Sequence, residues 1–88
     1  PEFVVTSVRM SAQNWSGALR ISGDIVDVYA LTDTGASMVS AGAVVLDYPS
    51  LDGLQPTDDA VITIAVRRES LPAVLLAARE EQLWLVGK

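Results

Sequence analysis

Alternation of apolar and polar residues predicts a chain built mainly of β-strands. A period of two along the sequence is typical of strands that bury one face. The segments with this period are residues 4–10, 25–31, 39–48, 60–66 and 82–86. In the fourth segment, Ile62, Ile64 and Val66 share one face, and in the second, Val26 and Val28 do so. The pattern therefore predicts about five strands.

Only residues 70–79 show the period of an α-helix. Ser70 can cap the first turn, and Pro72 is tolerated there because its missing N–H would have no partner. The apolar stripe consists of Leu71, Val74, Leu75 and Ala78. Residues 11–22 are polar and lack this period, so we expect them to be irregular. The predicted fold is mostly β with one short helix: a small β-barrel or rolled sheet of about five strands.

Turn and loop residues separate the predicted strands. Ala41-Gly42 is a candidate β-bulge inside the third strand. Residues 50–59 contain glycine, proline and several aspartates, which indicates a solvated loop. The 88 residues suffice for one domain. Residues 1–3, Pro-Glu-Phe, resemble a cloning junction, so we assign the domain to residues 4–88.

Composition excludes several classes of function. The chain has 6 basic and 11 acidic residues, for a net charge of −5. Nucleic-acid binding requires a cationic face, so no nucleic-acid partner is expected. The absence of Cys and His removes thiol and imidazole catalysis and the usual zinc ligands. The four aspartates near residues 47–59 do not match an EF-hand loop. We therefore expect no cofactor, no metal site and no enzymatic activity.

The segment Asp33-Thr34-Gly35-Ala36-Ser37 matches the catalytic loop of aspartic proteases. In dimeric, retropepsin-like enzymes, two such loops bring together two carboxylates that activate a water. Thr32 stands where those enzymes usually have a large apolar residue, and no glycine-rich flap is evident. The same residue types are ordinary in a turn between two strands. We favour the turn and keep a dimeric protease using Asp33 as an alternative.

The two tryptophans are the candidate contact residues. Trp15 lies in a polar segment and is the better candidate for an exposed contact, whereas Trp84, on a short strand, is expected to be half-buried. Aromatic rings of this kind can stack on a sugar. A module that binds envelope glycans through Trp15 or Trp84 is therefore a second alternative.

Several segments together resemble a known family. Residues 23–30, Gly-Asp-Ile-Val-Asp-Val-Tyr-Ala, resemble the Gly-Asp-x-Val-Asp-Val segment of the Flp (Tad, tight-adherence) pilus assembly proteins CpaB and RcpC. Residues 61–66, 70–78 and 83–86 are similar to that family's ending, where a Val-Thr-Leu-Ala-Val strand precedes a helix and a last strand. Residues 44–47 resemble the middle strand of the same domain.

The resemblance spans residues 4–86 and includes departures. Ser22 stands in place of the usual proline, Ile25 in place of a frequent arginine, and residues 80–82 in place of a glycine after the helix. In that family this β-rich domain follows a SAF domain and an N-terminal membrane anchor. The resemblance implies an extracytoplasmic, membrane-tethered, non-catalytic domain of a cell-envelope pilus or secretion apparatus. Its partners would be other protein subunits, with membrane contact only through an anchor outside this sequence; an oligomer is compatible with this interpretation.

Overall fold

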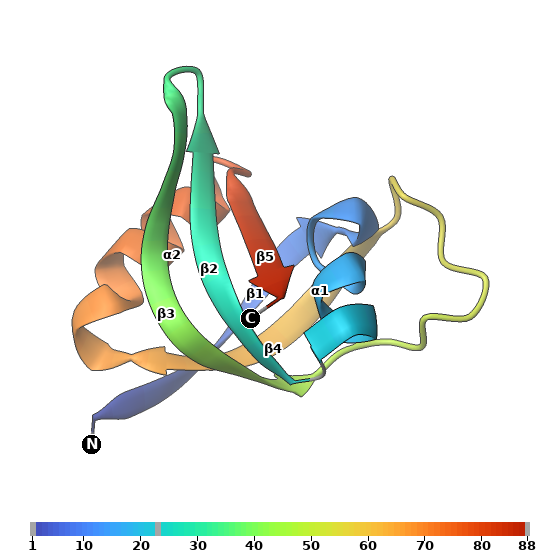
Figure 1. Cartoon of the computed structure of the whole chain (residues 1–88), viewed down its shortest axis with the longest axis horizontal. Helices are drawn as coiled ribbons and strands as arrows, with labels where there is room; N and C mark the ends of the chain where they lie inside the picture. Colours follow the sequence, from blue (N-terminus) through green and yellow to red (C-terminus); the bar gives the residue numbers. More distant parts are fainter. Residues whose placement is uncertain (1, 23, 88) are drawn as a thin grey trace.

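The computed structural model describes residues 2–22 and 24–87 and shows a mostly β protein with two helical regions (Figure 1). The strands are β1 (Phe3–Ser11), β2 (Ile25–Thr32), β3 (Gly35–Asp47), β4 (Asp59–Arg67) and β5 (Leu83–Gly87). A short 3₁₀ turn, η1 (Ala12–Asn14), and helix α1 (Ser16–Ser22) follow β1, and η2 (Arg68–Ser70) and α2 (Leu71–Arg79) follow β4. None of the helices among the described residues is long and apolar enough to cross a membrane.

The five strands form one antiparallel sheet in the order β1-β4-β3-β2-β5. The sheet curls, so that its two end strands, β1 and β5, approach each other (Figure 1). Helix α2 contacts both β1 and β5, and α1 contacts β5 and β2. The helices therefore cover the opening of the rolled sheet, and α2 lies where the sequence predicted a helix at residues 70–79.

The inner face of the curl is the hydrophobic core. Along β2 and β4, alternate residues point inward and are almost fully buried, which confirms the faces predicted for these two strands from the period of two. The most buried strand residues are Val26, Val28, Ala43, Ile62, Ile64 and Val66, each with 0% exposure. Full burial of a Val or Ile side chain contributes roughly 1.5–3 kcal/mol. The core is thus the main source of stability in this small domain.

The predicted bulge at Ala41-Gly42 is confirmed. Val26 pairs with Ala43 and Val28 with Ser40, so two residues of β3 face the single residue Asp27 of β2. Gly42 has a φ of 69°, in the left-handed region that favours glycine. Its N–H donates to the Asp27 carboxylate at 3.0 Å. A bulge bends its strand and increases the local twist, which favours the curl of the sheet.

The expectation of an irregular segment at 11–22 was wrong, because η1 and α1 lie there. Trp15, Ala18 and Leu19 are all buried and are spaced at i, i+3 and i+4, which is the spacing of one helical face. The many polar residues around them conceal this short stripe. Packing against the core, and not helix propensity, therefore accounts for α1.

The second helix begins and packs differently from the prediction. Ser70 belongs to η2, has helical angles and makes no side-chain capping bond, so the predicted cap is absent. Val74 and Ala77 are the buried residues of α2, with Leu71 and Ala78 partly buried. Leu75 is 46% exposed and lies outside this stripe, so its assignment to the core was wrong.

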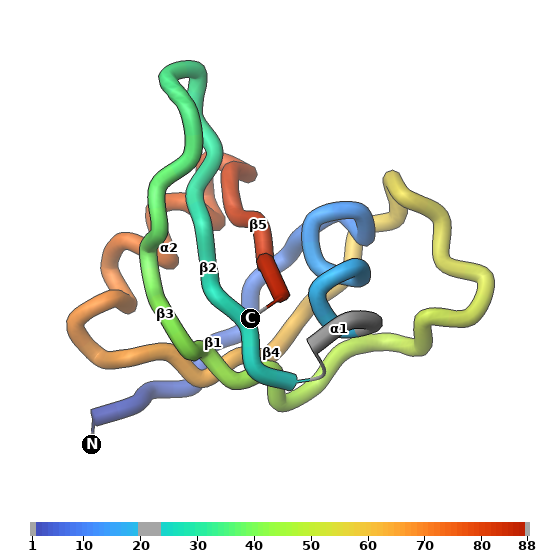
Figure 2. The backbone as a smooth tube through the Cα atoms, in the orientation of Figure 1, coloured from blue at the N-terminus to red at the C-terminus, as the bar shows by residue number. Residues whose placement is uncertain are grey.

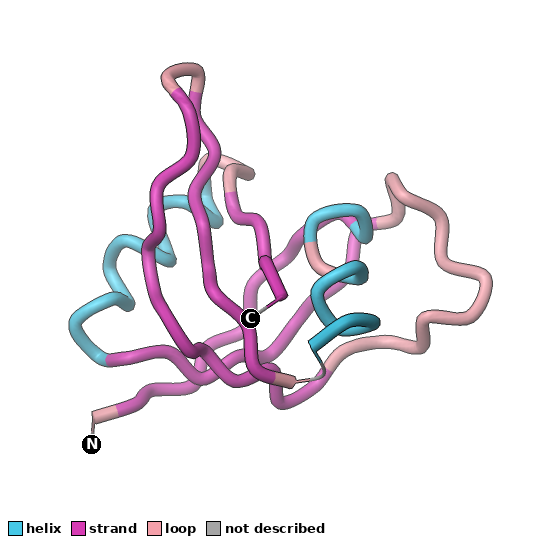
Figure 3. The backbone as a smooth tube through the Cα atoms, in the orientation of Figure 1, coloured by secondary structure: helices cyan, strands magenta, loops and turns pink. Residues whose placement is uncertain are grey.

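The long loop between β3 and β4 matches the prediction of a solvated segment (Figure 3). Two backbone bonds tie its end to η1: the Ala12 N–H donates to the Asp58 carbonyl at 2.8 Å, and the Gln13 N–H to the Pro56 carbonyl at 3.0 Å. The loop is therefore anchored where it enters β4.

Candidate functional site

Asp33 lies in the tight turn of the β2–β3 hairpin, which projects beyond the rest of the sheet (Figure 2). Thr32 pairs with Gly35 across the turn, and the Thr32 hydroxyl donates to the Gly35 carbonyl at 3.2 Å. Gly35 has a φ of 130°, which favours glycine at this position. The preferred interpretation, a turn between two strands, is confirmed for Asp33 and Thr34, whereas Gly35, Ala36 and Ser37 already belong to β3. Asp33 is exposed, and a pair of such carboxylates would require a second copy of the chain.

Trp15 is not an exposed contact residue, so that prediction was wrong. Its exposure is 0%, and it is one of the largest fully buried side chains of the core. Its ring packs against Tyr48 with a centroid distance of 6.0 Å and an interplanar angle of 55°. Polar neighbours in the sequence do not keep a large aromatic ring in solvent, because burial of the ring in the core stabilises the folded chain.

Trp84 is half-buried on β5, as predicted, and lies on the outer face of the sheet. It pairs with Tyr29 of β2, and Tyr29 pairs on its other side with Met38 of β3. Cross-strand partners share a face, so the three side chains form a row across three strands. We call Trp84, Tyr29 and Met38 the aromatic row.

A second apolar row crosses the outer face on four strands. Register pairs Val5 with Ala65, Ala65 with Val44, and Val44 with Ile25. Val5 is 63% and Ile25 50% exposed. We call these four residues the outer row. Their positions in the sequence did not distinguish them as a surface, because Val5 and Ala65 alternate with the predicted core residues of their strands.

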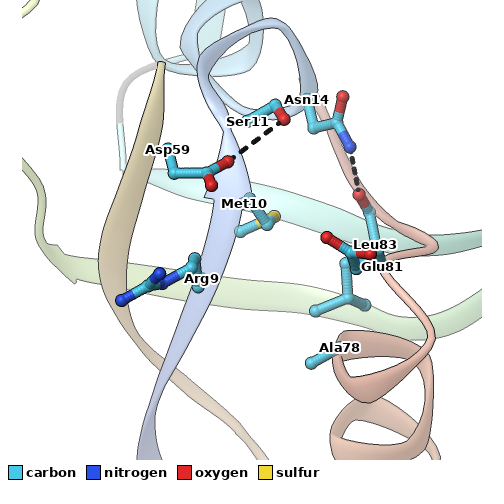
Figure 4. A pocket seen from close by; sticks show the side chains of 8 residues that line it. All are labelled: Arg9, Met10, Ser11, Asn14, Asp59, Ala78, Glu81 and Leu83. Atoms are coloured by element: carbon cyan, nitrogen blue, oxygen red, sulfur yellow. Dashed lines mark hydrogen bonds between the residues drawn. The ribbon is translucent and has the colours of Figure 1, made fainter. Parts of the chain in front are cut away.

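A pocket of about 110 Å³ lies where the end strand β1 faces the C-terminal end of α2 and the start of β5 (Figure 4). We call it the seam pocket. The lining residues lie on β1, η1, β4 and α2, in the turn after α2 and at the start of β5. They are Arg9, Met10, Ser11, Asn14, Asp59, Ala78, Glu81 and Leu83. The pattern along the chain did not predict it because the lining residues come from three distant stretches, 9–14, 59 and 78–83.

Two side-chain hydrogen bonds hold the walls of the seam pocket. The Asn14 amide donates to the Leu83 carbonyl at 2.9 Å, which ties η1 to the end strand β5. The Ser11 hydroxyl donates to an Asp59 carboxylate oxygen at 3.4 Å, across the β1–β4 pair. Both bonds are drawn in Figure 4. The pocket is therefore bounded by groups that are already held in place.

Glu81 lines this pocket and has an unusual backbone conformation. Among the described residues it is the one non-glycine residue with a positive φ, 57°. The Gln82 N–H donates to the Ala77 carbonyl at 2.9 Å and the Glu81 N–H to the Ala78 carbonyl at 3.1 Å. These two bonds form a Schellman motif, in which the position of Glu81 is usually glycine. The helix end thus fixes the direction of the Glu81 side chain.

Over the described ranges 2–22 and 24–87, no group of three or more Asp or Glu residues is arranged to hold a metal ion. The arrangement instead offers apolar surface on the outer face and a small pocket with charged walls. In comparisons with known proteins, no family model, curated protein or solved structure matched the chain.

Proposed function

We propose that this protein is a non-catalytic assembly domain that works through contacts with other protein subunits. The observation that carries the proposal is the outer row, Val5, Ala65, Val44 and Ile25, which is apolar across four strands of a folded sheet. Surface patches of this kind in small soluble domains mark interaction sites. Val61 of β4 and Leu46 of β3 are further exposed apolar residues, at 54% and 53%, and the polar pair Ser7 and Thr63 separates Val61 from the outer row.

The aromatic row adds residue types that are enriched at protein interfaces. Trp, Tyr and Met are over-represented in interface cores, where their large side chains exclude water. Met38 is 50% exposed, whereas Trp84 and Tyr29 are half-buried, so the row is partly ordered before any partner binds. Side chains already held in place lose less conformational entropy on association.

The setting that we propose is a cell-envelope pilus or secretion apparatus of the Flp type. It rests on the resemblance of residues 23–30, 44–47, 61–66, 70–78 and 83–86 to the CpaB and RcpC proteins. The order of β4, α2 and β5 along the chain agrees with the strand, helix and strand at the end of that family's domain. In this proposal the domain is extracytoplasmic and tethered by an anchor outside the sequence.

Site-specific photo-cross-linking in the parent cell tests the proposal. A photoreactive residue at Ile25 should give discrete cross-links to a subunit of the pilus or secretion apparatus in the envelope fraction. The same residue at Asp52, in the loop between β3 and β4, is the matched control and should give few. Deletion of the gene should abolish surface pili or secretion. Intact assembly in the deletion strain, or a cytosolic location of the protein in the wild-type cell, would contradict the proposal.

Glycan binding is a second candidate function because Trp84 and Tyr29 are cross-strand partners on the outer face. Trp15 is fully buried, so only Trp84 of the two tryptophans can stack on a sugar. A titration with cell-wall fragments, followed by tryptophan emission, should then respond in the wild type and not in Trp84→Phe. An unchanged emission in the wild type would eliminate this candidate.

A further inference from the structure

We propose that the projecting β2–β3 hairpin pairs with the same hairpin of a second copy of this chain, β3 against β3, around a two-fold axis at Ser37. The pairing is antiparallel and places Ala36 of each copy opposite Met38 of the other. This inference goes beyond the proposed function, because it concerns an edge of the sheet and a partner identical to the chain itself. It does not depend on any envelope subunit.

One edge of β3 has no partner strand where the hairpin projects. Strand β3 pairs with β4 only at Val44, Val45 and Asp47, whereas its pairing with β2 continues to Gly35. Among the described residues, no strand pairs with residues 36–38 on the side opposite β2, and no backbone bond from a loop or turn reaches them. Figure 1 shows the end of the hairpin beyond the other elements. We call residues 36–38 the free edge.

The hydrogen-bond pattern shows which backbone groups lie on the free edge. Directly opposite residues of an antiparallel pair alternate between hydrogen-bonded and non-hydrogen-bonded pairs. The Leu31 N–H donates to the Gln82 carbonyl at 2.8 Å, away from β3, so Leu31 and its partner Ala36 form a non-hydrogen-bonded pair. Tyr29 and Met38 form the next such pair, two residues along. The N–H and C=O groups of Ala36 and Met38 therefore point to the free edge, where an added strand can bind them.

These backbone groups are complementary to themselves under two-fold symmetry. With the axis at Ser37, Ala36 of one copy forms a hydrogen-bonded pair with Met38 of the other, and symmetry supplies the reverse pair. Each N–H then donates to a C=O of the other copy. At the axis, the two Ser37 residues form a non-hydrogen-bonded pair, and their small side chains suit its close approach. The register shift after Met38 ends the regular edge, so the contact is short.

The side chains beside the free edge are apolar on the outer face. Met38 is 50% and Leu31 39% exposed. Met38 belongs to the aromatic row, and Leu31 lies on the same face because it is two residues from Tyr29 on β2. In the paired hairpins, Met38 lies opposite Ala36 of the second copy, next to Leu31 of that copy. The aromatic row thus continues across the axis, and pairing removes apolar surface of both copies from water.

The free edge lacks the charges that usually prevent strand addition. Residues 34–46 contain no charged side chain, although 19% of the chain is charged. Edge strands of soluble proteins commonly carry Lys or other charges that keep a second strand away. In the antiparallel register, the two Asp33 residues lie at opposite ends of the contact, more than about 20 Å apart at roughly 3.3 Å per residue. Like charges therefore do not meet in the interface, despite the net charge of −5 on each copy.

Sedimentation equilibrium of the purified chain tests the inference. The average mass should rise with concentration from 9.3 kDa toward twice that value, because so short a contact gives a weak dimer. Higher salt should strengthen the dimer, since it screens the repulsion between two acidic copies. A monomer at all concentrations up to about 1 mM, or a dimer that salt dissociates, would overturn the proposal. Growth beyond the dimer would also contradict it, because a two-fold contact is closed.

A disulfide probe locates the contact. The chain contains no Cys, so Ser37→Cys introduces a single thiol, which faces its symmetry mate across a close non-hydrogen-bonded pair. Mild oxidation should link this variant into a covalent dimer. Asp33→Cys, in the turn of the same hairpin, is the matched control and should remain monomeric. Equal linking of the two variants, or faster linking of Asp33→Cys, would contradict pairing at Ser37.

A charge on the free edge tests the contact without cross-linking. Met38→Lys should weaken self-association roughly tenfold or more, because it brings two like charges into the interface. Leu46→Lys is the matched control, since Leu46 lies on the same strand outside the free edge and is 53% exposed, against 50% for Met38. It should leave the dimer unchanged, and circular dichroism checks that both variants fold. Equal weakening by the two substitutions would argue against the free edge.

The two proposals fail in different experiments. A monomeric chain that still gives cross-links from Ile25 to an envelope subunit would remove only the hairpin pairing. A dimer linked through Ser37→Cys, with no envelope partner or assembly defect, would remove only the proposed function.

Discussion

The inner and outer faces of the sheet are built from the same strands and differ in what covers them. On β4, Ile62, Ile64 and Val66 point inward and have 0% exposure, whereas Val61 points outward and is 54% exposed. Both sets are rich in β-branched residues, so strand propensity does not distinguish them. The curl of the sheet and the two helices cover one face only.

This difference shows that apolar residues on the two faces have different roles, in stability on the inner face and in association on the outer face. Inner residues stabilise the folded chain, because unfolding exposes them to water. Outer residues are exposed in the folded and unfolded states alike and add little to the free energy of unfolding. Their apolar surface contributes a favourable free energy only when another molecule covers it and removes it from water. Four substitutions test this comparison.

Ile64→Ala on the inner face should have the largest effect. Removing a fully buried Ile side chain to Ala costs about 2–5 kcal/mol of the free energy of unfolding, through lost burial and a residual cavity. For a domain of this size such a loss is a large share of the total. Urea denaturation followed by circular dichroism measures it. A loss below about 1 kcal/mol would contradict the assignment of Ile64 to the core.

Gly42→Ala should have a smaller effect than Ile64→Ala and sharpens the comparison at the bulge. Here Asp27, on the outer side of β2, does contribute to the fold by accepting the Gly42 N–H. With a φ of 69°, an alanine at this position costs about 1–2 kcal/mol.

Gly17→Ala is the matched control for the bulge glycine. Gly17 lies in α1, and a methyl group added there meets nothing within 4 Å. Helix propensity makes this change stabilising by up to about 1 kcal/mol. If thermal melting showed the same sign for both glycines, the bulge interpretation would be contradicted.

Glu81→Gly should stabilise the protein, by about 1 kcal/mol. Its φ of 57° is unfavourable for a side chain with a Cβ, and glycine removes that cost. The seam pocket would at the same time lose one carboxylate. Thermal melting measures the change: a higher melting temperature is expected, and a lower one would argue against backbone strain at Glu81.

Val61→Thr on the outer face should have the smallest effect, within about 0.5 kcal/mol, because the new hydroxyl stays in water. Val66→Thr, the same change on the inner face of the same strand, buries a hydroxyl and should cost about 1–3 kcal/mol. Chemical denaturation of the two variants compares the faces directly. Equal losses would contradict the difference between them.

Much of the fold followed from local patterns. The period of two predicted the inward positions of Ile62, Ile64 and Val66, and the pair Ala41-Gly42 predicted the bulge, because both depend on a few neighbouring residues. Helix α1 could not be predicted from the local pattern. The buried stripe of Trp15, Ala18 and Leu19, which begins just before the helix, is too short to stand out from its polar neighbours. Its stability comes from residues distant in sequence.

The candidate sites were less predictable than the fold. Trp84 was placed correctly because it alternates with the buried Leu83 and Leu85 on one strand. Trp15 was misplaced because its burial depends on contacts with other elements, among them Tyr48. The seam pocket could not be read from the chain at all, since Met10, Asp59 and Glu81 meet only after the sheet has curled.

The sequence by itself determined the number of strands, the buried faces of β2 and β4 and the turn at Asp33, because these depend on side-chain period and local backbone preference. The tertiary structure alone decided which apolar residues stay exposed, which tryptophan is covered and which distant side chains line one pocket. Burial is a property of the whole packed chain: a residue is hidden only by neighbours that the fold brings to it.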